Sequence, residues 1–102
     1  MNSDYIGNDM KFIVNPTATG FDKTTDDWEV TLSRGRVERT WTRDQLVVDE
    51  ENNFYLCFNT DDFGPGLYML TITVHVPDTD FDDGYREEVT QLPLINVNRL
   101  KK

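Results

Sequence analysis

The chain has a single cysteine, Cys57, among its 102 residues. One thiol cannot form a disulfide within the chain, so a fold held together by intrachain disulfides is excluded. Cys57 lies in an alternating apolar run and has no second cysteine or histidine at metal-ligand spacing. We therefore expect a packed or half-packed thiol rather than a metal ligand.

Basic residues are few, with ten Lys and Arg against 19 Asp and Glu, and the formal net charge is −9. Such a chain lacks the basic face that binds phosphate backbones or anionic lipid surfaces. We expect neither a nucleic-acid partner nor a membrane partner. The negative charge favours solubility, and it would also suit a cation or a basic protein.

Long apolar runs are missing as well. The first ten residues, MNSDYIGNDM, contain neither the basic region nor the apolar run of a secretory signal. No stretch reaches the length of a membrane span, and none shows sustained helical periodicity. These absences favour a cytoplasmic protein built from strands.

Short alternating runs separated by turn residues are what the sequence contains instead. In residues 28–33, for example, Trp28, Val30 and Leu32 fall on one face of a strand. The predicted strands are residues 10–15, 28–33, 36–42, 44–48, 53–59, 67–76, 85–91 and 94–97. Six to eight short strands at intervals of about 10 residues predict an all-β, antiparallel sandwich in one domain, residues 1–102.

The sequence also predicts the character of the segments between the strands. Residues 1–9 are polar and should be loose, residues 15–27 should form a long loop, and residues 98–102 should be a basic tail. The mixed charges of residues 36–42 are typical of an edge strand. Pro93 should interrupt the last strand, because proline cannot donate to a ladder.

An acidic loop follows the longest predicted strand, and it is the one candidate metal site. Asp78, Asp80, Asp82 and Asp83 precede Gly84, and alternate carboxylates can point at one calcium ion. The spacing departs from the helix–loop–helix calcium motif, which has glycine sixth and a bidentate Glu twelfth. The alternative is a solvated turn, and no other cofactor is expected.

Other chemistry is weakly indicated. His75 is the only histidine and cannot build a zinc site alone. Adjacent carboxylates on a strand point to opposite faces, which does not suit a glycosidase, and no phosphate loop or nucleophile motif is present, so we expect no enzyme. Strand aromatics serve either a core or a binding face for protein or carbohydrate. Trp41, Arg39 and Tyr85 are the candidate interaction residues.

The C-terminal half carries a resemblance to a known group. It has a glycine turn at residues 64–66, a long strand ending at Pro77, an Asp83-Gly84 turn, Arg86 with acidic neighbours, and a final strand at 94–97. In this it resembles small β-sandwich proteins of prophages and related mobile elements. The motif Gly66-Leu67-Tyr68 is also similar to a tyrosine held near a sandwich corner.

The resemblance implies an immunoglobulin-like module of a phage tail or baseplate, akin to the N-terminal domain of baseplate upper proteins. It implies no catalytic residues. Because no signal or membrane span is seen, we expect a cytoplasmic location before any virion assembly. Our leading interpretation is a non-enzymatic interaction module that assembles with itself or with other virion proteins. The alternative is a carbohydrate- or calcium-binding module.

Overall fold

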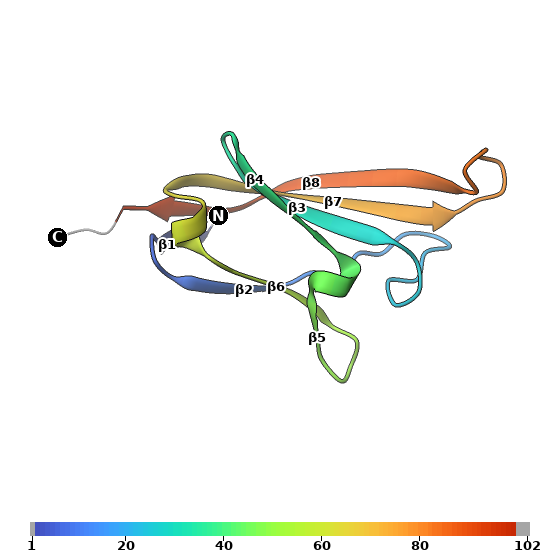
Figure 1. Ribbon diagram of the computed structural model, residues 1–102, viewed down its shortest axis with the longest axis horizontal. Helices are drawn as coiled ribbons and strands as arrows, with labels where there is room; N and C mark the ends of the chain where they lie inside the picture. Colours follow the sequence, from blue (N-terminus) through green and yellow to red (C-terminus); the bar gives the residue numbers. More distant parts are fainter. Residues whose placement is uncertain (1, 100–102) are drawn as a thin grey trace.

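The computed structural model describes residues 2–99 and shows an all-β sandwich of two sheets (Figure 1). The strands are β1 (Asn2–Tyr5), β2 (Asp9–Ile13), β3 (Trp28–Arg34), β4 (Val37–Thr42), β5 (Val47–Val48), β6 (Phe54–Asn59), β7 (Gly66–Pro77) and β8 (Tyr85–Asn98). The two helices, η1 (Arg43–Gln45) and η2 (Thr60–Asp62), are short 3-10 turns. Within residues 2–99, no helix is long and apolar enough to cross a membrane.

The strand order is immunoglobulin-like. One sheet has the order β1-β8-β7-β3-β4 and the other has the order β2-β6-β5. Neighbouring strands run antiparallel, except that β1 runs parallel to β8. In immunoglobulin terms β3, β7 and β8 take the places of strands C, F and G, and β2, β6 and β5 those of B, E and D. The predicted all-β sandwich is confirmed.

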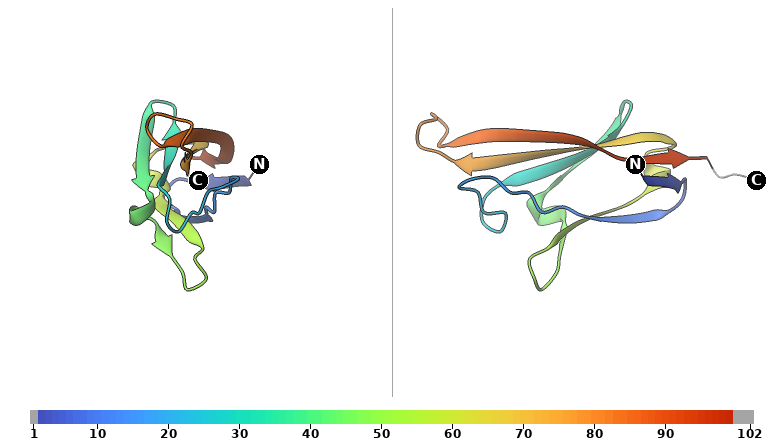
Figure 2. Two further views of the ribbon diagram at one scale, coloured as in Figure 1. Left: turned by 90° about the vertical axis from the view of Figure 1, so that its right-hand side faces the viewer. Right: turned by 180° about the vertical axis from the view of Figure 1, so that it is seen from behind.

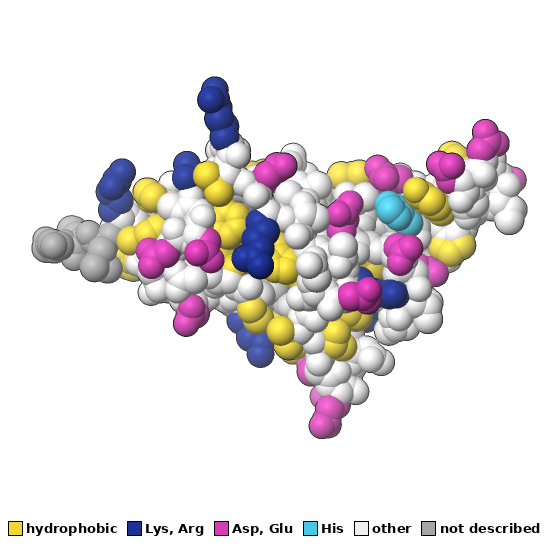
Figure 3. Space-filling view, in the orientation of Figure 1, with side chains coloured by type: hydrophobic (Ala, Val, Ile, Leu, Met, Phe, Trp, Pro, Cys, Tyr) yellow, Lys and Arg dark blue, Asp and Glu magenta, His cyan; other side chains and the backbone are white. Residues whose placement is uncertain are grey.

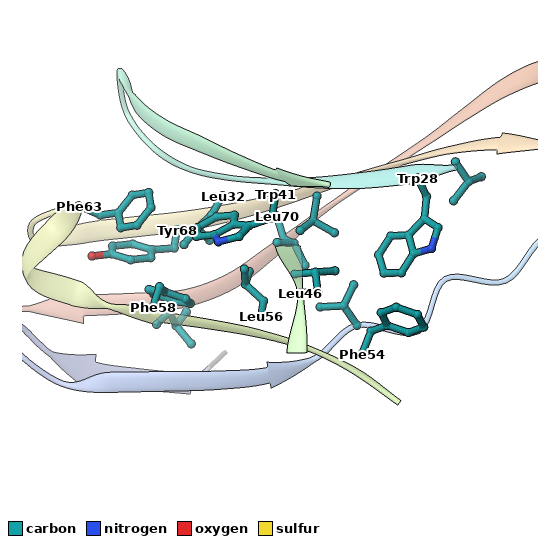
Figure 4. Packing of buried hydrophobic residues seen from close by; sticks show 14 of the residues in the cluster. Trp28, Leu32, Trp41, Leu46, Phe54, Leu56, Phe58, Phe63, Tyr68 and Leu70 are labelled. Carbon is teal, nitrogen blue, oxygen red and sulfur yellow. The ribbon is translucent and has the colours of Figure 1, made fainter. Parts of the chain in front are cut away.

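The core lies between the two sheets and is built from alternating positions of the facing strands, among them Trp28, Val30 and Leu32 of β3 (Figure 4). Trp28 packs edge-on against Phe54 across the sandwich, with 5.1 Å between ring centroids. Leu70 is buried two residues after Tyr68, where antibody domains place the second cysteine of their disulfide. Apolar packing therefore joins the sheets here in place of a covalent link.

A tyrosine corner fixes the connection from β6 to β7. The Tyr68 side chain is fully buried, and its hydroxyl lies 2.6 Å from the Gly64 carbonyl and 3.1 Å from the Thr60 carbonyl. Arg34 Nε donates to the Phe63 carbonyl of the same connection at 2.7 Å. The expected similarity to a corner tyrosine is thus borne out by the geometry.

The N-terminal segment differs from its expectation. Residues 2–5, expected to be loose, form β1 along the end of β8, and the Ile6 N–H continues the pairing with a 2.9 Å bond to the Asn98 carbonyl. Ile6 also packs against the core, which anchors the segment. Of the expected basic tail, residues 100–102 lie outside the described residues.

Pro93 does not interrupt the last strand. β8 continues from Tyr85 to Asn98, with a register shift at Tyr68/Met69 that leaves Leu94 as the extra residue of a bulge. Proline is tolerated at a sheet edge where its missing N–H points away from the neighbouring strand. Pro93 pairs with Met69 on one side, and β1 begins only beyond it, opposite Ile95.

The hairpin of β7 and β8 projects past the three-stranded sheet (Figures 1 and 2). The loop of residues 15–27 contains no strand, as predicted, and folds back beside this hairpin. Arg86 fastens the two together by donating to the Thr19 carbonyl at 3.0 Å and to Asp78 Oδ2 at 2.9 Å. Trp28 Nε1 holds the other end of the loop through the Lys23 carbonyl.

Two smaller expectations have opposite outcomes. β4 does lie at a sheet edge, as its mixed charges predicted. Cys57, expected to be packed or half-packed, is instead exposed. The difference arises because Cys57 belongs to the outward phase of β6, and the outer face of that sheet is not covered at this position.

Candidate functional site

The first half of β8 forms an open sheet edge. β1 pairs with β8 only from Ile95 to Asn98, and no other described strand lies along residues 85–93 on that side. The open stretch also exposes apolar side chains: Val89 is 58% exposed, and Tyr85 and Leu92 are each 36% exposed. A long open edge with exposed apolar residues is a template for pairing with another strand.

The backbone groups that face outward from this edge can be identified. Hydrogen bonds in an antiparallel ladder alternate from one residue pair to the next. The Asp78 N–H bonds to the Gly84 carbonyl, whereas the His75 N–H bonds to Asp27, on the β3 side. Even-numbered residues of β8 therefore bond to β7 in residues 86–92. Glu87, Val89 and Gln91 direct both N–H and C=O outward.

A second feature lies on the outer face beside this edge. The His75 and Tyr85 rings stack with 4.5 Å between centroids, and His75 Nε2 lies 3.4 Å from Glu87 Oε2. Figure 3 shows the imidazole among carboxylate groups near the hairpin end. A hollow of about 320 Å³ opens beside it. Its lining residues are Asp27, Trp28, Glu29, Thr42, Arg43, Asp44 and His75.

The acidic loop at the hairpin tip is a hydrogen-bonded turn. Asp78 accepts the Asp80 N–H at 3.0 Å and pairs with Arg86 at 2.9 Å. The backbone bond from Asp80 and the Arg86 guanidinium hold the pKa of Asp78 below its usual value. Asp82 and Asp83 are exposed. No group of three or more His, Cys, Asp or Glu that could hold a metal ion occurs in residues 2–99. The expectation of a calcium site among Asp78, Asp80, Asp82 and Asp83 is untested by the geometry, which engages Asp78 with Arg86.

The three candidate interaction residues have different environments. Trp41 is only 5% exposed and packs in the core, so its ring offers no contact surface. Arg39 is exposed and lies over that ring, with 4.6 Å from its guanidinium carbon to the ring centroid. Tyr85 begins the open edge and lines a second hollow of about 250 Å³ with Asp26 and Asp27. The structure therefore places Tyr85 on β8, apart from Arg39 and Trp41, which lie on β4 with β7 and β3 between.

The sequence pattern does not predict the open edge of β8. The signal for it was the charge-free stretch from Val89 to Pro93, which follows Arg86 and two glutamates. From the sequence, this stretch is expected to end one strand, with an interruption at Pro93 before the next. Only the pairing of β1 beyond Pro93 shows that it is one strand with half of its edge open.

The chain was compared with protein-family models, with curated proteins and with solved structures, and nothing matches in any of the three.

Proposed function

We propose that this protein is a non-enzymatic interaction module that binds an extended protein segment along the open edge of β8. The observation that carries the proposal is the outward orientation of the N–H and C=O groups of Glu87, Val89 and Gln91, in the stretch of β8 that no described strand covers. Strand addition uses such main-chain groups for affinity and alternate side chains for specificity.

The surroundings of the edge support this use. The loop of residues 15–27 and the Arg86 contacts to Thr19 and Asp78 brace the projecting hairpin. Because the hairpin is already held in place, its backbone should lose little conformational entropy when a partner strand binds. Exposed Val89 lies on the outer face and Leu92 on the inner face, so an added strand would bury apolar surface on both sides.

The finer form of the proposal is a component of a phage tail or baseplate that assembles with copies of itself or with other virion proteins. Its support is the resemblance of residues 64–97, which are the residues that form β7, β8 and the turns around them. Mass spectrometry of phage particles, purified after prophage induction in the source organism, tests this form. Absence of the chain from the particles would contradict it.

The binding edge is tested by selecting extended peptides from a displayed library against the protein. Selected peptides should bind the wild type and should bind a Val89→Pro variant at least about ten-fold more weakly, because proline removes an outward N–H. Glu38→Pro is the matched control, since Glu38 occupies an outward-facing position on β4, at the opposite edge of the same sheet. Peptides that bind Val89→Pro as tightly as wild type would overturn the assignment.

A second candidate function has one observation in its favour. Tyr85 presents an exposed ring at a hollow that also contains Asp26 and Asp27, and an aromatic platform beside carboxylates suits a sugar ring. A glycan array probed with wild type and with Tyr85→Ala tests it. Binding that disappears in the variant would favour carbohydrate recognition over strand addition.

A further inference from the structure

We infer that two copies of this chain pair through their β8 edges, antiparallel, about a two-fold axis at Val89. The pairing would join the two five-stranded sheets into one continuous sheet. This inference rests on the proposed function and names the partner strand as β8 of a second copy.

The outward-facing residues are arranged symmetrically around Val89. In an antiparallel pair with Val89 opposite Val89 of the second copy, Glu87 lies opposite Gln91 of that copy, and Gln91 opposite its Glu87. All three positions direct N–H and C=O toward the partner, so each pair can exchange two backbone hydrogen bonds. At each end of the pairing Tyr85 lies opposite Pro93, which accepts a backbone bond but has no N–H to donate.

The neighbouring symmetric registers form fewer backbone hydrogen bonds or place like charges opposite each other. Centring on Glu87 would place two carboxylates directly opposite each other, which is destabilising in a sheet. Centring on Gln91 would place Val89 opposite Pro93, which has no N–H, and would place Glu87 opposite Ile95, whose edge β1 occupies. Centring on Glu88 would place two Glu88 carboxylates directly opposite each other, which is destabilising. Centring on Thr90 would place Glu87 opposite Pro93, which has no N–H, and Tyr85 opposite Ile95, whose edge β1 occupies, so fewer backbone bonds could form. Centring on Val89 uses the most outward backbone groups of the open stretch.

The side chains agree with this register. On the outer face Val89 meets Val89, and Glu87 meets the amide of Gln91. On the inner face Glu88 meets Thr90, and Arg86 meets Leu92. No like charges lie directly opposite each other. The stretch from Tyr85 to Pro93 contains one Arg and two Glu, a charge of −1, so it carries little of the chain's net −9 into the interface.

The other long edges are protected against the same pairing. On β2, the Val14 N–H bond to the Phe54 carbonyl sets the phase so that Asp9, Lys11 and Ile13 face outward, and self-pairing would oppose two Lys11 side chains. A central lysine is a common device against edge association. On β4, the Thr42 N–H is already bonded to Gln45 Oε1 at 2.9 Å. Among the edges formed by residues 2–99, β8 alone has three outward residues without such protection.

Disulfide trapping tests the register directly. In a Cys57→Ser background, Val89→Cys should form a disulfide-linked dimer under mild oxidation, because residues opposite each other in a hydrogen-bonded pair lie about 5.5 Å apart at Cα. Thr73→Cys is the matched control. Thr73 is the β7 neighbour of Val89, and its counterpart in the dimer lies three strand spacings away, about 14 Å. Thr40→Cys reports on the β4 edge.

Solution mass completes the test. Sedimentation over a wide concentration range should show a monomer–dimer equilibrium that Val89→Pro weakens at least about ten-fold and Glu38→Pro leaves unchanged. Thr90→Pro should unfold the hairpin, since that N–H bonds to β7, and circular dichroism separates unfolding from lost pairing.

Trapping at Thr40 instead of Val89 would overturn the inference. A strict monomer that still selects peptides at the β8 edge would overturn self-pairing and leave the proposed function standing. A strict monomer that selects none would overturn both.

Discussion

The Tyr68 hydroxyl, near the start of β7, lies 2.6 Å from the carbonyl oxygen of Gly64, four residues earlier. The bond closes the connection between the two sheets from inside the core, where Tyr68 is fully buried. Burial raises the pKa of this hydroxyl, so it stays protonated and able to donate. The start of the projecting hairpin is therefore set by a side chain that also belongs to the core.

Replacing Tyr68 with Phe should lower the free energy of unfolding by about 1–2 kcal/mol, because buried carbonyls lose their donor while the ring packing remains. For a domain of this size, the melting temperature should fall by roughly 4–8 °C per kcal/mol. Thermal melts followed by circular dichroism measure the change. Tyr85→Phe, at the exposed start of β8, is a control for removing a tyrosine hydroxyl outside the core. A Tyr68→Phe protein as stable as the wild type would show that the corner bond contributes nothing.

Gly66 should not tolerate a side chain. Its φ is +136°, and a Cβ there would lie 2.9 Å from Arg34 Cδ. Gly66→Ala should cost at least about 1 kcal/mol of stability, because alanine is strained at this φ and displaces the Arg34 side chain from the Phe63 carbonyl. Urea unfolding of Gly66→Ala, Arg34→Ala and the double variant separates the two causes. If the contact matters, Gly66→Ala should cost less when Arg34 is already alanine; equal costs would assign the loss to the backbone alone.

Protonation of Asp49 should account for part of the loss of folding stability at low pH. Its carboxylate accepts the backbone N–H of Asn53 at 2.9 Å, and this bond, with others from Asn53, Tyr55 and Glu51, lowers its pKa from 3.8 to about 2. A depressed folded-state pKa gives stability that is present above the unfolded pKa and is lost as pH falls toward the folded value. The contribution of Asp49 should therefore disappear between about pH 4 and pH 2.

Denaturation midpoints measured from pH 7 to pH 2 check this expectation. Asp49→Asn should be less stable than wild type at pH 7 and should lose less stability on acidification, so that the two curves converge at low pH. The exposed neighbour Glu50 provides a control as Glu50→Gln. Parallel curves for wild type and Asp49→Asn would mean that other carboxylates, such as Asp78 beside Arg86, account for the acid loss.

Calcium should not stabilise the protein. The Asp78 carboxylate is already engaged by Arg86 and by the Asp80 N–H, whereas a calcium site needs six to eight oxygen ligands directed at one point. Melting temperatures with millimolar calcium, magnesium or chelator should agree. A rise specific to calcium that disappears in an Asp80→Ala, Asp82→Ala double variant would contradict this and establish a cation site at the hairpin tip.

Cys57 should react with a thiol reagent in the folded state, because its side chain is exposed on β6. Labelling with a chromogenic disulfide should go to completion without denaturant. The matched control is Leu56→Cys in a Cys57→Ser background, since Leu56 is fully buried on the opposite face of the same strand. That thiol should react only on unfolding. A native Cys57 that resists labelling would place it in a covered position, such as an interface.

The acidic loop and the candidate interaction residues show which features local sequence patterns can and cannot predict. The four aspartates lie close together in sequence, which suggests a metal-ligand set. Their orientation depends on the hairpin turn, however, and there Arg86 donates a hydrogen bond to Asp78. Trp41 and Arg39 share a strand face by alternation, yet the second sheet decides that the indole is buried and the guanidinium exposed. Burial of a strand face is a property of what packs against it, which no single strand contains.

The sequence by itself determined the all-β class and most of the strands. In β3 the alternation places Trp28, Val30 and Leu32 on one face, and all three are buried, because successive side chains of a strand point to opposite sides. Only the tertiary structure decided the strand order, the pairing of β1 with the end of β8 and the open edge left at Val89. These depend on hydrogen bonds between residues up to 93 positions apart, such as Asn2 and Ile95, and the local pattern of neither partner specifies the other.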